Sequence, residues 1–171
     1  MSLRPFAPDE FDMLWRAVVG ADPTAAVGSM DPDRLRERVQ ASGQVTEQEL
    51  LLAIEAEGRL IGSIQGYRDG LPQGVFGLGI ELFQERDRGK GHGTAAVKML
   101  VTRLFDGEGA RRVEAGTADL NAAMRAVLGR VGFNQEGILR RFYPSDDGRG
   151  VDCVMYGMTR DDYEDVRTTW T

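Results

Sequence analysis

Residues 81–97 constrain the fold more than any other stretch, because they join a strand pattern to a helix pattern through a glycine-rich turn. The segment reads Glu-Leu-Phe-Gln-Glu-Arg-Asp-Arg-Gly-Lys-Gly-His-Gly-Thr-Ala-Ala-Val. Alternate positions (Gly89, Gly91 and Gly93) lack side chains, so the backbone there can approach a ligand closely. The helix that follows presents unpaired N–H groups and the positive end of its dipole. We therefore expect a strand–turn–helix unit whose backbone faces a ligand.

Two cations sit in the same turn. Arg88 and Lys90 add full positive charges beside the backbone donors, which predicts a cradle for a pyrophosphate. The turn is not a Walker loop, because Gly91 rather than Ser or Thr follows Lys90. It is not the dinucleotide fingerprint either, because its glycines alternate. Taken alone, the segment is also compatible with an ordinary glycine-rich turn in front of a helix.

The rest of the chain predicts a mixed α/β fold, with a mostly antiparallel central sheet flanked by helices. Hydrophobic periodicity, caps and turn residues place the elements in the order β-α-α-β-β-β-α-β-α-β-β. No linker or repeat interrupts this order, so we expect one domain over residues 1–171. The expected strands are 3–6, 50–54, 59–64, 75–83, 112–117, 133–142 and 151–158. The expected helices begin near 11, 32, 94 and 121, with a loop at 20–30 and a helical turn at 159–163.

Composition excludes several classes of function. The net charge of −6 argues against nucleic acid as a partner, because phosphate binding needs a basic surface. One cysteine, Cys153, and one histidine, His92, leave no disulfide framework and no cysteine or histidine metal site, so we expect no metal. No apolar run approaches membrane-spanning length and no secretory signal is evident, which predicts a cytoplasmic protein without membrane contact.

The turn resembles a known family. Arg88-x-x-Gly91-x-Gly93 matches the acyl-CoA-binding motif of the GNAT (GCN5-related) N-acetyltransferases, and its wording looks most like the branch of ribosomal-protein and spermidine N-acetyltransferases. Three further stretches resemble the same branch in order and spacing. They are Asn121, the run from Gly132 to Arg140, and the closing segment 152–163. The resemblance covers residues 75–163, and the order of elements is also that of the family.

This resemblance implies acetyl-CoA as co-substrate. The pyrophosphate would lie on residues 88–94, namely Arg88, Gly89, Lys90, Gly91, His92, Gly93 and Thr94. Asn121 would contact the pantetheine arm. In the family the strand before the turn parts from its neighbour and admits this arm, so the backbone near Leu82 and Phe83 should face the thioester. A primary amine would then attack the acetyl carbonyl directly, with no covalent enzyme intermediate.

The sequence also departs from the family. Leu128 stands where many relatives carry a proton-donating tyrosine, and Met124 stands where this branch often has serine. The general acid therefore cannot be assigned from this helix by the resemblance. Glu81 is the first candidate for the base, with Glu114 and Asp119 as weaker ones. Tyr143 is the candidate proton donor to the thiolate. His92 is expected to contact CoA or support the turn, and Cys153 to be a buried thiol within a strand.

The acceptor is open: a small-molecule or peptide amine fits equally well. A homodimer through the late strands is an expectation by analogy. Two other classes of function remain. One is a CoA-binding sensor or partner-binding module with little catalysis, which the missing tyrosine favours. The other is a nucleotide-binding protein, although no Ser or Thr follows Lys90 to ligate magnesium.

Overall fold

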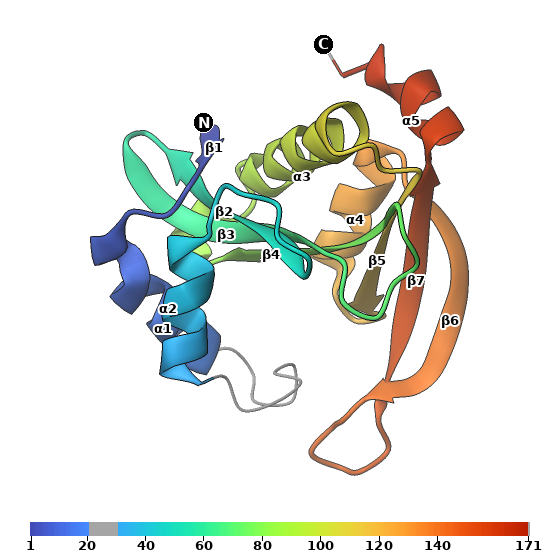
Figure 1. Ribbon diagram of the computed structural model, residues 1–171. Coiled ribbons are helices and arrows are strands. Elements are labelled where there is room, and N and C mark those ends of the chain that lie inside the picture. The colour runs from blue at the N-terminus through green and yellow to red at the C-terminus, as the bar shows by residue number, and fades with distance from the viewer. Residues whose placement is uncertain (21–30, 171) are drawn as a thin grey trace.

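A computed structural model describes residues 1–20 and 31–170. Seven strands form one sheet in the order β1-β2-β3-β4-β5-β7-β6 (Figure 1). The strands are β1 Ser2–Arg4, β2 Glu49–Ala56, β3 Arg59–Tyr67, β4 Val75–Leu82, β5 Arg112–Ala118, β6 Asn134–Tyr143 and β7 Val151–Thr159. The helices are α1 Phe11–Gly20, α2 Pro32–Gln40, α3 His92–Thr102, α4 Ala122–Val131 and α5 Arg160–Arg167. Most of the predicted loop at 20–30 lies outside the described residues.

The predicted fold class is confirmed. Neighbouring strands are antiparallel except at one place, where β4 and β5 run parallel over three residue pairs, Val75↔Arg112, Phe76↔Val113 and Gly77↔Glu114. Parallel strands need a crossover, and α3 supplies it. The parallel ladder stops there, although β4 continues to Leu82 and β5 to Ala118.

Helices cover the two faces of the sheet unequally (Figure 1). The face here called the α3 face carries the main core, where α3 and α4 bury side chains against β2–β5 and β7; its fully buried members include Leu52, Ile64, Val97, Leu100 and Leu128. The face here called the α2 face carries a smaller core under α1 and α2, made of Phe6, Leu14, Leu35, Val39, Leu51, Ala53 and Leu60. Over β4, β5 and β7 this smaller core is absent from the described residues, which leaves that part of the α2 face for other roles.

Local capping signals fix several helix ends as expected. The Asp31 carboxylate accepts the Asp33 N–H at 3.1 Å at the start of α2. Gly132 adopts a left-handed conformation (φ 101°) and ends α4. Thr159 and Asp162 form a reciprocal capping box that starts α5.

Several predicted boundaries were wrong. The first strand ends at Arg4 rather than at residue 6, because Phe6 turns into the core beneath α1 and α2. The predicted hairpin strands 50–54 and 59–64 extend to 49–56 and 59–67. The expected helical turn after Thr159 is a helix of eight residues, since Tyr163 stacks on Phe105 with ring centroids 4.7 Å apart and stabilises the continuation.

None of the described helices combines the length and the apolar character needed to cross a membrane.

Candidate functional site

The defining feature of the site is the gap that opens between β4 and β5 beyond Gly77. The Phe83 N–H donates to the Ile61 carbonyl at 2.9 Å, which continues the β3–β4 ladder in register with Gly62↔Leu82. In an antiparallel ladder, alternate residues direct their backbone groups to opposite neighbours. The N–H and C=O groups of Leu78, Ile80 and Leu82 therefore point away from β3 and into the gap.

This alternation revises one expectation. The backbone N–H of Phe83 is engaged with β3, so Phe83 does not offer it to a ligand in the gap. Leu82 does face the gap, and its carbonyl accepts a hydrogen bond from Arg88 Nη2 at 3.2 Å. The guanidinium of the predicted cradle thus reaches back over the mouth of the gap.

The glycine turn lies at the open end of the gap. Gly89 (φ 71°) and Gly91 (φ 84°) both adopt left-handed backbone, and a Cβ built on either would meet nothing within 4 Å. Gly91 is the N-cap of α3, and the first helical hydrogen bond runs from the Ala95 N–H to the Gly91 carbonyl at 3.0 Å. The N–H groups of residues 92–94 precede this bond and have no helical acceptor. The turn therefore presents donors and open space together.

Beneath the turn lies a buried carboxylate that the sequence reading did not single out. Asp87 is 1% exposed and sits in the short helical turn Glu85–Asp87, directly before Arg88. Its Oδ1 accepts from Arg59 Nη2 at 3.1 Å, whereas Oδ2 has no partner in the described part of the chain. The pair connects the turn to the start of β3.

Helix α4 packs beside α3, and Asn121 lies at its start. The Asn121 Oδ1 accepts the Met124 N–H at 3.0 Å and caps the helix, which leaves the Asn121 amide nitrogen free of that role. Leu128 is fully buried in the main core. Its position explains why this helix contributes no proton donor there.

Of the three carboxylates considered for the base, Glu81 and Glu114 lie on the α2 face, at different distances from the closed end of the gap. Burial raises the pKa of the Glu81 carboxyl, and the charge of Arg88 opposes that shift. Glu114 belongs to the last β4–β5 pair, and its Oε2 accepts from Arg112 Nε at 3.3 Å. Asp119 lies beyond β5, where its N–H donates to the Asp152 carbonyl.

Tyr143 reaches the same face from β6. The Cys153 thiol donates to the Tyr143 hydroxyl at 3.5 Å, and the hydroxyl lies 3.7 Å from where a Cβ on Gly116 would be. Burial, and then the contact with Cys153, raises the pKa of the Tyr143 phenol, so the hydroxyl keeps its proton at neutral pH. Cys153 is 1% exposed, which confirms the buried thiol.

A further residue, Tyr67, was not predicted from sequence. Strand register places Tyr67, Gly77 and Glu114 side by side on three adjacent strands. A Cβ on Gly77 would lie 2.0 Å from Tyr67 Cζ and 2.5 Å from its hydroxyl, so the ring lies directly across β4. Burial raises the pKa of Tyr67, with smaller contributions from the charges of Glu114 and Cys153. No local sequence motif predicts that Tyr67, Gly77 and Glu114 lie side by side, because their alignment depends on the register of β3, β4 and β5.

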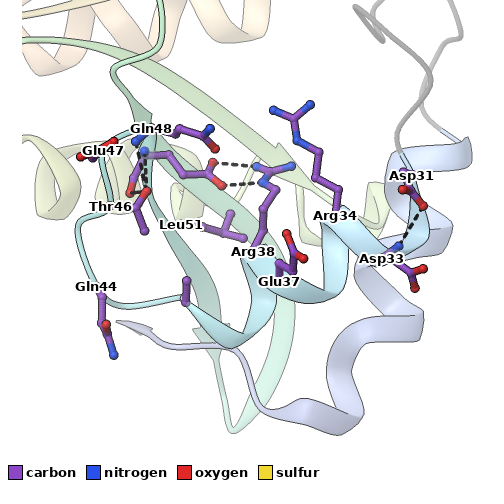
Figure 2. Close-up of a pocket in the computed structure, with 12 residues that line it drawn as sticks. Asp31, Asp33, Arg34, Glu37, Arg38, Gln44, Thr46, Glu47, Gln48 and Leu51 are labelled. Carbon is purple, nitrogen blue, oxygen red and sulfur yellow. Dashed lines mark hydrogen bonds and ion pairs between the residues drawn. The ribbon is translucent and has the colours of Figure 1, made fainter.

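A separate cavity of about 640 Å³ lies between α2 and residues 44–49 on the α2 face (Figure 2). The guanidinium of Arg38, which is labelled in Figure 2, donates two hydrogen bonds to the Glu49 carboxylate, of 2.5 and 2.7 Å. Arg38 Nη2 also donates to Gln65 Oε1 at 2.7 Å. Most of the charged side chains that line this cavity are acidic: Asp31, Asp33, Glu37, Glu47 and Glu49 are acidic, and Arg34 and Arg38 are basic.

Comparison with known proteins identifies the family. The sequence profile of the acetyltransferase (GNAT) domain matches residues 1–134. No significant match was found among curated protein sequences.

Solved structures share the fold. RimJ from Mycobacterium smegmatis, in complex with CoA-disulfide, superposes with a TM-score of 0.76 at 22% identity, covering 98% of this chain and 88% of that one. A chimera of the spermidine N-acetyltransferase SpeG from Vibrio cholerae gives 0.77 at 16% identity, covering 95% and 97%. The aminoglycoside acetyltransferase AAC(6')-Ib, in complex with coenzyme A and kanamycin, gives 0.72 at 22% identity, covering 97% and 98%.

Proposed function

Because the chain belongs to the GNAT acetyltransferase family, we propose that it transfers the acetyl group of acetyl-CoA to a primary amine. The observation that carries this proposal is the gap between β4 and β5, whose open end meets the free N-terminus of α3. A gap lined by unpaired backbone groups suits a ligand with amides along its length. A helix N-terminus suits its pyrophosphate.

The cradle would hold the pyrophosphate through the backbone of residues 89–94, with charge from Arg88 and Lys90. The pantetheine arm would run along β4 and pair with the gap-facing groups of Leu78, Ile80 and Leu82. Asn121 would contact it from the start of α4. In this arrangement Arg88 exchanges its bond to the neutral Leu82 carbonyl for one to the phosphate, where both partners are charged and two parallel bonds can form.

The chemistry would need no nucleophilic side chain. The amine attacks the acetyl carbonyl directly, and a gap-facing backbone N–H of β4 stabilises the oxyanion that forms. The C–S bond then breaks, and the Tyr143 hydroxyl donates a proton to the departing thiolate. The phenol is protonated over the whole neutral range, so a proton is available at this position.

The acceptor would be a small-molecule or peptide amine. Structurally similar proteins include a spermidine N-acetyltransferase and an aminoglycoside acetyltransferase crystallised with kanamycin, both named for cationic amines. The chain's own charge of −6 favours approach of such cations by steering.

Calorimetric titration with acetyl-CoA tests the cradle, with wild type beside Gly91→Glu and Gly109→Glu. Both glycines have left-handed φ (84° and 65°) and open space at Cβ, so the two substitutions strain the backbone similarly. Only Gly91 belongs to the cradle. We expect wild type and Gly109→Glu to bind and Gly91→Glu to lose binding. Equal loss in both variants, or no binding by wild type, would contradict the proposal.

Turnover on spermidine, kanamycin and a peptide with a free N-terminus then separates enzyme from sensor. Acetylation above the uncatalysed rate supports the transferase. Tight CoA binding with background turnover on the whole panel would support the CoA-binding module instead. ATP that displaces acetyl-CoA would support the nucleotide-binding alternative.

A further inference from the structure

We propose that Glu114, not Glu81, accepts the proton of the acceptor amine, and that the Tyr67 hydroxyl holds that amine over Gly77. This inference rests on the proposed acetyl transfer. It adds to that function a specific acceptor position on the α2 face, at the closed end of the gap between β4 and β5.

The length of β4 indicates where the thioester would lie. The cradle is at the open end of the gap, past Leu82, and the sulfur is at the opposite end of the pantetheine arm. From Leu82 back to Gly77 the strand spans about 16 Å at roughly 3.3 Å per residue. An arm lying along β4 therefore brings the thioester toward Gly77↔Glu114, where the strands rejoin.

Tyr67 and Glu114 lie at this closed end of the gap. The Tyr67 ring crosses β4 because Gly77 has no side chain, so its hydroxyl lies above the strand next to β5. Glu114 pairs with Gly77 on that neighbouring strand, whose backbone runs about 4.8 Å from that of β4. The effect of the Glu114 charge on the Tyr67 phenol is consistent with this proximity. A carboxylate and a phenol thus share the closed end of the gap.

Arg112 orients the Glu114 carboxylate. Arg112 Nε donates to Glu114 Oε2 and fixes that oxygen, while the same guanidinium meets Glu136 at 2.7 and 2.5 Å. Within the described ranges no hydrogen bond engages Glu114 Oε1 or the Tyr67 hydroxyl. The Glu114 side chain is 21% exposed, so a ligand can reach it. One oxygen is held and the other is available.

Glu81 is less well placed. It lies four residues beyond Gly77 on β4, toward the cradle, and the charge that opposes its raised pKa is Arg88 of the cradle itself. In a complex with CoA, Glu81 therefore lies beside the arm or the phosphates rather than beside the acetyl group.

The protons balance as follows. The acceptor R–NH₃⁺ gives one proton to Glu114 and becomes the amine that forms the N–C bond. When the tetrahedral intermediate collapses, the C–S bond breaks and the thiolate receives a proton from Tyr143. The second N–H proton of the intermediate replaces the one that Tyr143 gave. Glu114 then releases its proton to solvent, so the net products are the amide, CoA–SH and one proton.

The test compares the pH–rate profiles of Glu114→Gln and Glu81→Gln. We expect Glu114→Gln to lower kcat by about 100-fold at pH 7 with little change in KM for acetyl-CoA, as for loss of a general base. The loss should shrink as pH approaches about 10.4, the usual pKa of an alkyl ammonium, because free amine needs no base. Arg112 pairs with Glu114, and the charge of Glu114 acts on Tyr67; Glu136 meets the same guanidinium, and Cys153 and Tyr143 contact each other on the neighbouring strands. All of these groups are unchanged in both variants. A purely structural defect would not recover with pH.

Two further variants complete the design. The Glu136 side chain is partly exposed and forms the other ion pair of Arg112. Glu136→Gln breaks that pair and should keep kcat within about threefold of wild type. Tyr67→Phe should raise KM for the amine and leave KM for acetyl-CoA unchanged. The proposal is overturned if Glu81→Gln, rather than Glu114→Gln, shows the loss with recovery at high pH. If wild type binds no CoA or acetylates no amine of the panel, the proposed function itself fails. A wild type that turns over while Glu114→Gln equals it overturns this inference alone.

Discussion

Arg59 Nη2 lies 3.1 Å from Asp87 Oδ1, and this ion pair fastens the glycine turn to the start of β3. The two residues differ in environment, because the Arg59 side chain is 43% exposed and that of Asp87 is 1% exposed. The carboxylate therefore depends on one partner, and its second oxygen has none among the described residues. A negative charge beneath an anion cradle is costly, and Arg59 offsets it.

Arg59→Gln should destabilise the protein by about 2 kcal/mol, because it leaves the buried carboxylate unpaired. Urea denaturation measures the change. Arg36→Gln, which removes an exposed pair with Asp33, is the matched control and should cost at most about 0.5 kcal/mol. Adding Asp87→Asn to Arg59→Gln should restore part of the loss. Equal losses of stability in Arg59→Gln and Arg36→Gln would show that the Arg59–Asp87 pair stabilises the protein no more than an exposed ion pair does.

Gly77→Ala should destabilise the protein by about 2 kcal/mol and lower turnover, because the new methyl group displaces the Tyr67 ring. Gly79→Ala, on the same strand and face, should cost less than about 1 kcal/mol. Its Cβ meets the flexible end of Gln65 at 3.1 Å. Chemical denaturation and kcat, measured side by side, check the pair. Similar losses in both variants would mean that the strand, rather than Tyr67, resists the change.

Asn121→Asp separates helix capping from ligand contact. Aspartate caps helices as well as asparagine does, so the free energy of unfolding should change by less than about 0.5 kcal/mol. The variant loses the amide nitrogen, and we expect the Kd for acetyl-CoA to rise by roughly tenfold, the loss of one hydrogen bond with a penalty for the new charge. Unchanged affinity would remove Asn121 from the CoA site.

Glu81→Gln should stabilise the protein at pH 7.5 and have no effect near pH 4. Burial raises the pKa of Glu81 in the folded state, so the native protein binds the extra proton more tightly than the unfolded chain does. Wild type therefore keeps full stability below the unfolded pKa and loses some as pH rises through the folded value, whereas glutamine does not titrate. Thermal unfolding midpoints at both pH values test the sign. Glu85→Gln, an exposed change in the neighbouring turn, is the matched control for removing a carboxylate.

Sequence reasoning succeeded where the determinants are local. The left-handed Gly91 and the cap at Asn121 depend on a few neighbouring residues, and the pattern around them is readable. The role of Phe83 was less accessible, because only register decides whether a backbone N–H faces β3 or the gap. Tyr67 was missed for the same reason. Its ring lies over Gly77, which pairs with Glu114 on the next strand, and nothing near Tyr67 in the chain indicates that relationship.

The short parallel ladder between β4 and β5 has a mechanical consequence. Three residue pairs are the only strand pairing between β1–β4 and β5–β7 within the described chain, so this seam is shorter than the β3–β4 and β5–β7 ladders on either side of it. An extended ligand bound in the gap would act as a surrogate strand and extend the seam along the rest of β4. The amides of Leu78, Ile80 and Leu82 should then exchange with deuterium more slowly, and the two halves of the sheet should unfold as one cooperative unit.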